Sequence, residues 1–232
     1  MPIETSGTTL SAILWDMDGT LVDTEPVWVQ CERELMADFD YAWNEADAAF
    51  CIGGPMEKVE QYMYEKSGRR ENPSWFGERL VEMMLERLTS DVIVKPGVRS
   101  MIDESSRAGV KQALVSASRR AIVDAVVRGI GISFDFVVSA SEVARSKPHP
   151  EGYLTSAARL GIPIHECVVF EDSPVGILAG VESGTLTLGL SEVEIEHQNF
   201  RRIGTLLDFS YEDLTLVHRD WVIDREGAGT PR

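Results

Sequence analysis

Two carboxylates, Asp16 and Asp18, directly follow a short apolar segment and precede Gly19 and Thr20. The apolar segment, residues 10–15, predicts a buried strand bounded by turn-forming residues. Side chains two residues apart point to the same side of an extended chain, so both carboxylates can reach one small volume. Two close carboxylates repel each other unless a cation lies between them or they share a proton. This pattern indicates a site for a cation or for acid–base chemistry, rather than a loop that only caps the next helix.

A second pair of carboxylates, Glu171 and Asp172, ends the apolar run over residues 167–170. Ser173 and Pro174 follow, at positions typical of a helix N-cap and of the first residue of a helix. Capping needs only one polar residue, and three are present. Taken alone, this pair leaves two roles open, metal ligation and helix capping.

Two further groups are suited to binding a phosphate. Ser116 and Ala117 stand at the expected start of a helix, where a hydroxyl and backbone N–H groups suit a phosphoryl oxygen. A serine at such a position is commonly only a helix cap. Lys147 lies in a loop ahead of another predicted helix and supplies a positive charge, although a single loop lysine is commonly solvated. Neither signal is specific alone.

The elements that would position these residues follow from the rhythm of apolar segments after residue 95. We expect strands at residues 110–115, 136–138, 167–170 and 186–188, and helices at residues 98–109, 119–128, 151–160 and 175–183. This alternation predicts parallel βαβ units and therefore an α/β fold, a doubly wound, mostly parallel, Rossmann-like sheet. Ligand sites in such sheets lie at the carboxyl ends of the strands. Asp16, Ser116, Lys147 and Asp172 should therefore meet there.

Between residues 24 and 90 the apolar positions recur at helical spacing, and no strand is predicted. Helical patterns begin at Glu25 and cover residues 45–50, 56–65 and 76–88. An all-helical insert directly after the first strand is most simply a cap over the site. We expect two domains, a catalytic core over residues 1–22 and 93–232 and a helical cap over residues 23–92.

The C-terminal region is less informative. Residues 191–205 give no clear pattern and are expected to be irregular. Residues 211–217 predict a last helix or an edge strand. The polar, glycine-containing tail from Arg225 predicts disorder.

The chain is strongly acidic, with 38 Asp and Glu against 22 Lys and Arg and a net charge of −16. This balance argues against a nucleic acid or an acidic membrane as partner, and any phosphate site needs local positive charge. The cysteines, Cys31, Cys51 and Cys167, form no CxxC pair, which is typical of free thiols in a reducing compartment. No leader or long apolar stretch is present, so we expect a soluble cytoplasmic protein, as a monomer or a weak homo-oligomer.

The order of these groups along the chain, an acid pair, a serine, a lysine and a second acid pair, resembles the four motifs of the haloacid dehalogenase superfamily. The similarity covers roughly residues 10–190 and points to the branch that contains helical-cap phosphatases and β-phosphoglucomutases. The resemblance implies that Asp16 is the nucleophile that becomes an aspartyl phosphate. It implies that Asp18 protonates the leaving oxygen and then activates water.

The same resemblance implies the binding roles. Ser116, Ala117 and Lys147, with the loop residues Gly19 and Thr20, would bind the phosphate. Mg²⁺ would be the cofactor. Its ligands would be Asp172 and Asp16, with Glu171 in support and the backbone carbonyl of Asp18.

Several activities remain to be separated within the family. Dehalogenases and phosphonate-cleaving members lack an acid at the position of Asp18, so hydrolysis of a small phosphorylated metabolite is favoured, a sugar phosphate being one candidate. Phosphomutases of this branch are the alternative. They carry a His where this chain has Trp28 and an Arg in the first cap loop, where residues 53–56 offer none, although Lys58 or Arg87 could substitute. A non-catalytic protein is disfavoured by the intact Asp16, Asp18, Lys147 and Asp172. A receiver-like signalling module is disfavoured by the cap and by Asp18, since a receiver gains nothing from a lid over a substrate.

Overall fold

The computed structural model describes residues 9–88 and 92–228. In these residues the centre is a sheet of six strands in the order β3-β2-β1-β4-β5-β6, and every neighbouring pair is parallel. The strands are β1 (Ala12–Trp15), β2 (Lys111–Val115), β3 (Phe136–Val138), β4 (Cys167–Glu171), β5 (Leu186–Gly189) and β6 (Phe200–Arg202). The register pairs Trp15 with Leu114 and Phe170, so the ends of β1, β2 and β4 lie side by side. The predicted doubly wound α/β fold is confirmed.

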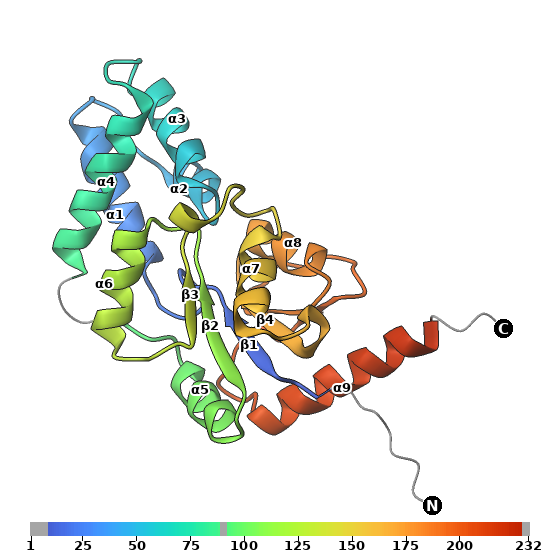
Figure 1. Cartoon of the computed structure of the whole chain (residues 1–232). Coiled ribbons are helices and arrows are strands. Elements are labelled where there is room, and N and C mark those ends of the chain that lie inside the picture. The colour runs from blue at the N-terminus through green and yellow to red at the C-terminus, as the bar shows by residue number, and fades with distance from the viewer. Residues whose placement is uncertain (1–8, 89–91, 229–232) are drawn as a thin grey trace, which may run out of the picture.

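Helices cover both faces of the sheet, as strands buried on both sides require. These helices are α5 (Val98–Arg107), α6 (Arg120–Ile130), α7 (Glu151–Leu160), α8 (Pro174–Glu182) and α9 (Tyr211–Ala228). Side chains of α5, α6 and α9 pack with Trp15 and Phe170 on one face, whereas α7 and α8 pack around Leu14 and Val169 on the other. Figure 1 shows α6 and α7 on opposite sides of the strands. In the described part of the chain, no helix combines the length and hydrophobicity needed to cross a membrane.

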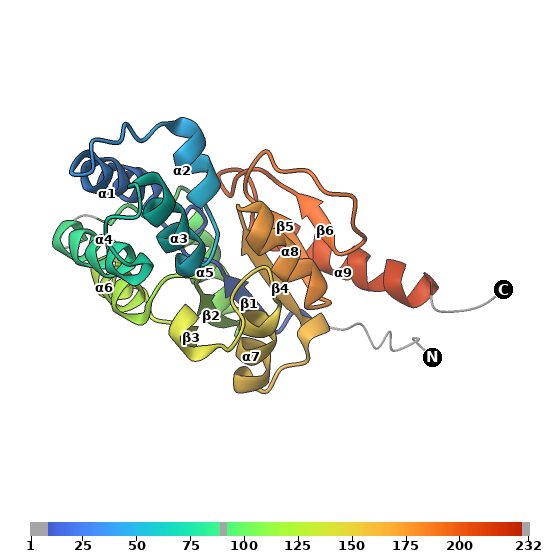
Figure 2. The same ribbon diagram turned by 90° about the horizontal axis from the view of Figure 1, so that it is seen from above.

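The segment after β1 forms helices that cover the carboxyl ends of the strands (Figures 1 and 2). They are α1 (Glu25–Ala37), α2 (Glu45–Cys51), α3 (Met56–Lys66) and α4 (Pro73–Arg87). Two short 3-10 helices lie elsewhere in the chain, Ala140–Glu142 after β3 and Ile164–Glu166 directly before β4. As predicted, no strand occurs among the described residues from 24 to 88. Leu35, Met63 and Phe76 share one hydrophobic cluster with the sheet face that carries Trp15. The division of the chain into a core and a cap stays a prediction.

Two C-terminal segments differ from the sequence-based prediction. The region expected to be irregular contains β6, a strand of three residues whose Phe200 packs against Ile177 and Val181 of α8. A strand this short is stabilised by its neighbours and shows no alternating pattern of its own. Helix α9 continues to Ala228, so the expectation of disorder from Arg225 is wrong for residues 225–228. The Arg225 guanidinium donates to the carbonyl of Gly184 at 2.7 Å, which ties this end of the helix to the core. Residues 229–232 of that tail, and the N-terminal residues 1–8, lie outside the described part.

Trp15, the last residue of β1, is fully buried directly before Asp16. Its ring stacks on Phe170 of β4, with 4.7 Å between the ring centroids. Its indole Nε1 donates to Gln112 Oε1 of β2 at 2.8 Å, and Gln112 Nε2 donates to Ser105 Oγ of α5 at 2.9 Å. One side chain therefore fixes β1 against both neighbouring strands, and this fixes where Asp16 emerges from the sheet.

Replacing Gln112 with Met should destabilise the protein by about 1–3 kcal/mol, because the buried Trp15 N–H then has no acceptor. The free energy of unfolding can be measured by urea denaturation. The double variant Trp15→Phe/Gln112→Met removes the donor as well. Its loss in the free energy of unfolding should be clearly smaller than the sum of the losses in the two single variants, since no buried donor without an acceptor remains. Strict additivity, within about 0.5 kcal/mol, would contradict this coupling.

Candidate active site

Lys147 and Asp16 form a buried ion pair where the strands end. Lys147 Nζ lies 2.5 Å from Asp16 Oδ1, 2.7 Å from Glu171 Oε1 and 3.1 Å from the carbonyl oxygen of Val115. These partners come from the ends of β1, β4 and β2, which the parallel register places side by side. The ammonium group thus connects three neighbouring strands, and it binds an acid from each of the two carboxylate pairs seen in the sequence.

The negative charge at this point exceeds the positive charge that Lys147 supplies. Burial raises the pKa of Asp16 well above its ordinary value, the nearby Glu171 carboxylate adds to the effect, and Lys147 partly offsets it. The pKa of Lys147 itself lies above its usual range, because the attraction of Asp16 and Glu171 outweighs the effect of its burial. One ammonium group therefore serves several acids, and the site favours a further cation.

The donor set fits a hard divalent cation. Carboxylate oxygens of Asp16, Glu171 and Asp172 lie within 4.8 Å of one another, and clustered carboxylate oxygens are the ligands that Mg²⁺ prefers. Burial, followed by the charges of Glu171 and Glu25, raises the pKa of Asp172 to about 7. Such a pKa means that Asp172 carries its full negative charge at neutral pH only when a positive charge compensates it.

Glu171 has fewer free oxygens than its neighbours. Its Oε1 accepts from Lys147 and from the hydroxyl of Tyr153, both at 2.7 Å, and its Oε2 accepts from the backbone N–H of Asp172 at 3.1 Å and from Ser173. It is fully buried. Glu171 therefore supports the group from behind, whereas Asp16 and Asp172 are the acids with oxygens available to hold a cation.

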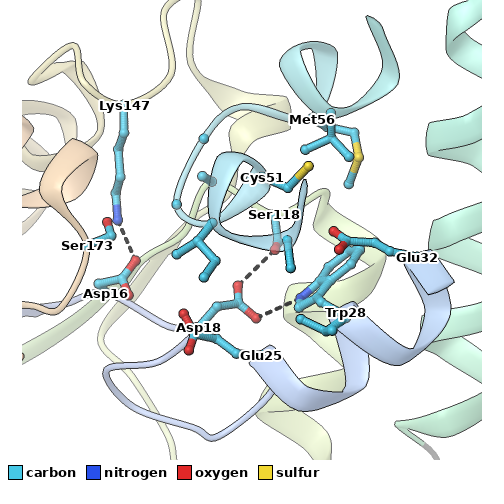
Figure 3. Close-up of a pocket in the computed structure, with 17 residues that line it drawn as sticks. Asp16, Asp18, Glu25, Trp28, Glu32, Cys51, Met56, Ser118, Lys147 and Ser173 are labelled. Carbon is cyan, nitrogen blue, oxygen red and sulfur yellow. Dashed lines mark hydrogen bonds and ion pairs between the residues drawn. The ribbon is translucent and has the colours of Figure 1, made fainter. Parts of the chain in front are cut away.

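The carboxylate of Asp18 lies apart from this group and is held by three donors. Thr24 Oγ1 donates to Oδ1 at 2.5 Å. Trp28 Nε1 also donates to Oδ1, at 3.2 Å, and Ser118 Oγ donates to Oδ2 at 2.9 Å (Figure 3). Thr24 stands at the N-cap of α1 but makes no capping bond with its side chain. The hydroxyl that the sequence could have assigned to capping is thus used to orient Asp18.

Gly19 and Thr20, predicted to bind phosphate, lie against Asp172. Gly19 has a φ of +84°, and a Cβ there would meet Asp172 Oδ2 at 2.2 Å, so only glycine fits. Thr20 is fully buried, and its hydroxyl donates to Asp172 Oδ1 at 3.0 Å. Both residues therefore shape the position of the Asp172 carboxylate.

Ser116 and Ala117 follow β2 beside Lys147, as the prediction required. Ser116 Oγ accepts from the backbone N–H of Ser118 at 2.9 Å, and Ser116 shares a small secondary cavity with Lys147. Ala117 and Ser118 line the main cavity. Ser118 was missed by the sequence analysis, because nothing in the order of residues tells which of two serines in a tight turn faces Asp18.

The main cavity, of about 100 Å³, lies between the strand ends and helices α1, α2 and α3. Its lining within the described chain contains four acids, Asp16, Asp18, Glu25 and Glu32, and a single cation, Lys147. Figure 3 shows Lys147 and Glu32 on opposite sides of the cavity. Positive charge is thus confined to the end that carries Asp16.

Comparison with known proteins agrees with this geometry. The model of the family described as haloacid dehalogenase-like hydrolase matches residues 13–190. Hexitol phosphatase B of Escherichia coli (strain K12) is 32% identical over 178 residues, which are 72% of this chain and 78% of that protein. Fructose-1-phosphate phosphatase YqaB of the same organism is 29% identical over 176 residues, covering 75% of this chain and 93% of the relative.

Among solved structures, β-phosphoglucomutase from Clostridium difficile superposes with a TM-score of 0.81 at 21% identity, covering 93% of this chain and all of that one. At this identity the similarity concerns the fold alone. The family match spans most of the chain and includes β1 from Ile13 onward, Lys147 and both acid pairs. The chain therefore belongs to the haloacid dehalogenase-like hydrolases.

Proposed function

We propose that this protein is a Mg²⁺-dependent phosphatase that hydrolyses a small phosphorylated metabolite. The observation that carries the proposal is the pairing of Asp16 with the buried Lys147, beside an Asp18 carboxylate fixed by three donors on the same cavity. The two curated relatives described above are named as phosphatases of hexitol phosphates and of fructose 1-phosphate, which supports the same reaction class.

In the proposed first step, Asp16 attacks the phosphorus atom. Lys147 holds Asp16 Oδ1, which leaves Oδ2 to form the new bond to phosphorus. As the bond from phosphorus to the ester oxygen breaks, Asp18 in its acid form gives its proton to that oxygen, and the free alcohol departs. A carboxylate nucleophile divides the hydrolysis into two easier steps through an aspartyl phosphate.

In the second step, Asp18 acts as a base. It takes a proton from a water molecule whose oxygen bonds to phosphorus, and the bond from phosphorus to Asp16 breaks. Inorganic phosphate is released, Asp16 regains its carboxylate and Asp18 regains its proton. Thr24, Trp28 and Ser118 keep the Asp18 carboxyl group in one orientation through both transfers.

Asp16 and Asp172, supported by Glu171, would hold the Mg²⁺ ion. The bound ion would offset the charge on the phosphoryl oxygens, which lets an anionic nucleophile approach an anionic substrate. Thr20 and Gly19 keep the Asp172 carboxylate in place for this role. Lys147 and the residues after β2, Ser116 and Ala117, would bind the remaining phosphoryl oxygens.

The alternative, a phosphomutase, is less well supported by the charges of the cavity. A mutase passes the phosphoryl group from Asp16 to a substrate that already carries one, so its cavity must hold two phosphates. Within the described lining, Lys147 is the sole cation. The two candidates for a second cation are engaged elsewhere, since Lys58 Nζ donates to the Phe50 carbonyl at 2.7 Å and Arg87 pairs with Glu34.

Asp16→Asn should abolish turnover of phosphate esters, because an amide oxygen is a far weaker nucleophile. Asp18→Asn should lower kcat by roughly 10²–10⁴-fold, the usual contribution of a positioned acid–base group. Asp23→Asn, which changes an exposed carboxylate in the same loop, should leave kcat unchanged. Phosphate release can be measured with a chromogenic ester, after circular dichroism has verified each fold. Wild-type rates in a folded Asp16→Asn variant would refute the mechanism.

The affinity for Mg²⁺ should depend on pH. The folded-state pKa of Asp172 is raised to about 7 without a bound ion, so below that pH a proton must leave before the ion binds. We expect the dissociation constant for Mg²⁺ to increase by about tenfold for each pH unit below 7 and to level off above it. Calorimetric titrations at about pH 6 and about pH 8 would test this. Equal affinity at both values, or binding retained by Asp172→Asn, would contradict the assignment.

A further inference from the structure

Glu32 is a buried carboxylate for which the catalytic steps have no use. It lies on α1 with 4% of its surface exposed, in the wall of the main cavity. Its Oε2 accepts from the indole N–H of Trp43 at 3.0 Å. Trp43 is itself fixed by edge contacts with the rings of Tyr41 and Tyr62, at 6.2 and 5.7 Å between centroids. The carboxylate is therefore held from behind by a rigid aromatic cluster.

The second oxygen of Glu32 has no hydrogen-bond partner among the described residues. Across residues 9–88 and 92–228, no hydrogen bond or ion pair reaches Oε1. Figure 3 shows the carboxylate directed into the cavity, beside Met56 and Trp28. Burial raises the pKa of Glu32 to about 7, and the hydrogen bond from Trp43 and the charge of Arg33 offset this in part. Burying a carboxyl group without a partner is unfavourable, so this oxygen is suited to a donor supplied by a ligand.

The surroundings of Glu32 define which ligands fit. Around Glu32, the α1–α3 side of the cavity presents apolar side chains, among them Met56, Cys51 and Val59, whereas Glu25 lies near Asp18. Lys147 lies on the opposite side, with Asp16. A ligand phosphate at Asp16 thus has its counter-charge, whereas a second anionic group at the far end would face the Glu32 carboxyl group and no cation in the described lining.

We infer that Glu32 is a specificity-determining residue, which accepts a hydrogen bond from a hydroxyl at the end of the substrate far from the phosphate. It thereby selects phosphate monoesters of neutral polyhydroxylated alcohols and discriminates against esters that carry a second phosphate or a carboxylate. This inference rests on the proposed phosphatase function and adds the substrate class. It assigns Glu32 to binding, so its effect falls on KM and on the ratio between substrates.

Matched pairs of substrates test the inference. Each neutral ester is compared with an analogue that carries a second anion: glycerol 3-phosphate with 3-phosphoglycerate, fructose 1-phosphate with fructose 1,6-bisphosphate, and sorbitol 6-phosphate with 6-phosphogluconate. The wild-type protein should favour the neutral member of the best pair by at least about tenfold in kcat/KM.

Glu32→Gln keeps the shape of the side chain and an acceptor for Trp43, but it turns a hydrogen-bond donor toward the substrate. It should raise KM for the neutral ester by about ten- to a hundredfold with little change in kcat. The ratio of kcat/KM between the neutral ester and its anionic analogue should fall by a similar factor.

The control is Glu34→Gln, the same chemical change on the same helix at a residue that faces away from the cavity and pairs with Arg87. It should leave the ratio of kcat/KM within every pair of substrates at its wild-type value. If Glu32→Gln does not fold, Trp43→Phe can replace it, because this change removes the donor that fixes the Glu32 carboxylate. It should also lower the kcat/KM preference for the neutral ester over its anionic analogue. A neutral ester that lacks its terminal hydroxyl, 1-deoxysorbitol 6-phosphate, should bind more weakly than sorbitol 6-phosphate to the wild-type protein.

The possible results separate the two proposals. Hydrolysis of no ester by the Mg²⁺-loaded wild-type protein would overturn the phosphatase function, and this inference with it. Hydrolysis with equal preference for both members of every pair would overturn the role of Glu32 alone. So would an unchanged preference in folded Glu32→Gln, or equal KM values for the deoxy ester and its parent.

Discussion

The buried ammonium group of Lys147 is the interaction on which the rest of the site depends. It is bound by Asp16, Glu171 and the carbonyl of Val115, which end three adjacent parallel strands. Without its charge, the carboxylates gathered there would repel one another in a setting where burial already disfavours their ionised forms. Parallel pairing brings these groups to one edge, and the Trp15 side chain locks β1 in the register that this requires.

Helix α1 connects the strand edge, where the chemistry is proposed to occur, with the part of the cavity proposed to recognise the substrate. Thr24, Trp28 and Glu32 follow one another at intervals of four residues, so they form one stripe along the helix. The first two donate to Asp18, and the third faces the far end of the cavity. A neighbouring stripe that includes Cys31 and Leu35 is buried in the hydrophobic cluster shared with the sheet. One helix thus orients the proposed acid–base group, Asp18, and also lines the part of the cavity that would distinguish substrates.

The sequence predicts the architecture well, because the strands are apolar runs and the helices between them have their own periodicity. It also predicts which polar residues follow each strand, and the structure brings Asp16, Lys147, Glu171 and Asp172 together. The direction of each side chain could not be predicted. Thr20 donates to Asp172, and Glu32 turns into the cavity, because tertiary contacts fix these orientations.

Detection of a phosphoryl group on Asp16 tests the central claim most directly. The Mg²⁺-loaded protein would be mixed with a reactive phosphate monoester, quenched with acid within milliseconds, and digested for mass spectrometry. The account predicts a transient gain of one phosphoryl group on the peptide that contains Asp16, absent from Asp16→Asn and prolonged in Asp18→Asn, where water is activated poorly. Steady release of inorganic phosphate with no phosphorylated Asp16 at any quench time would contradict it.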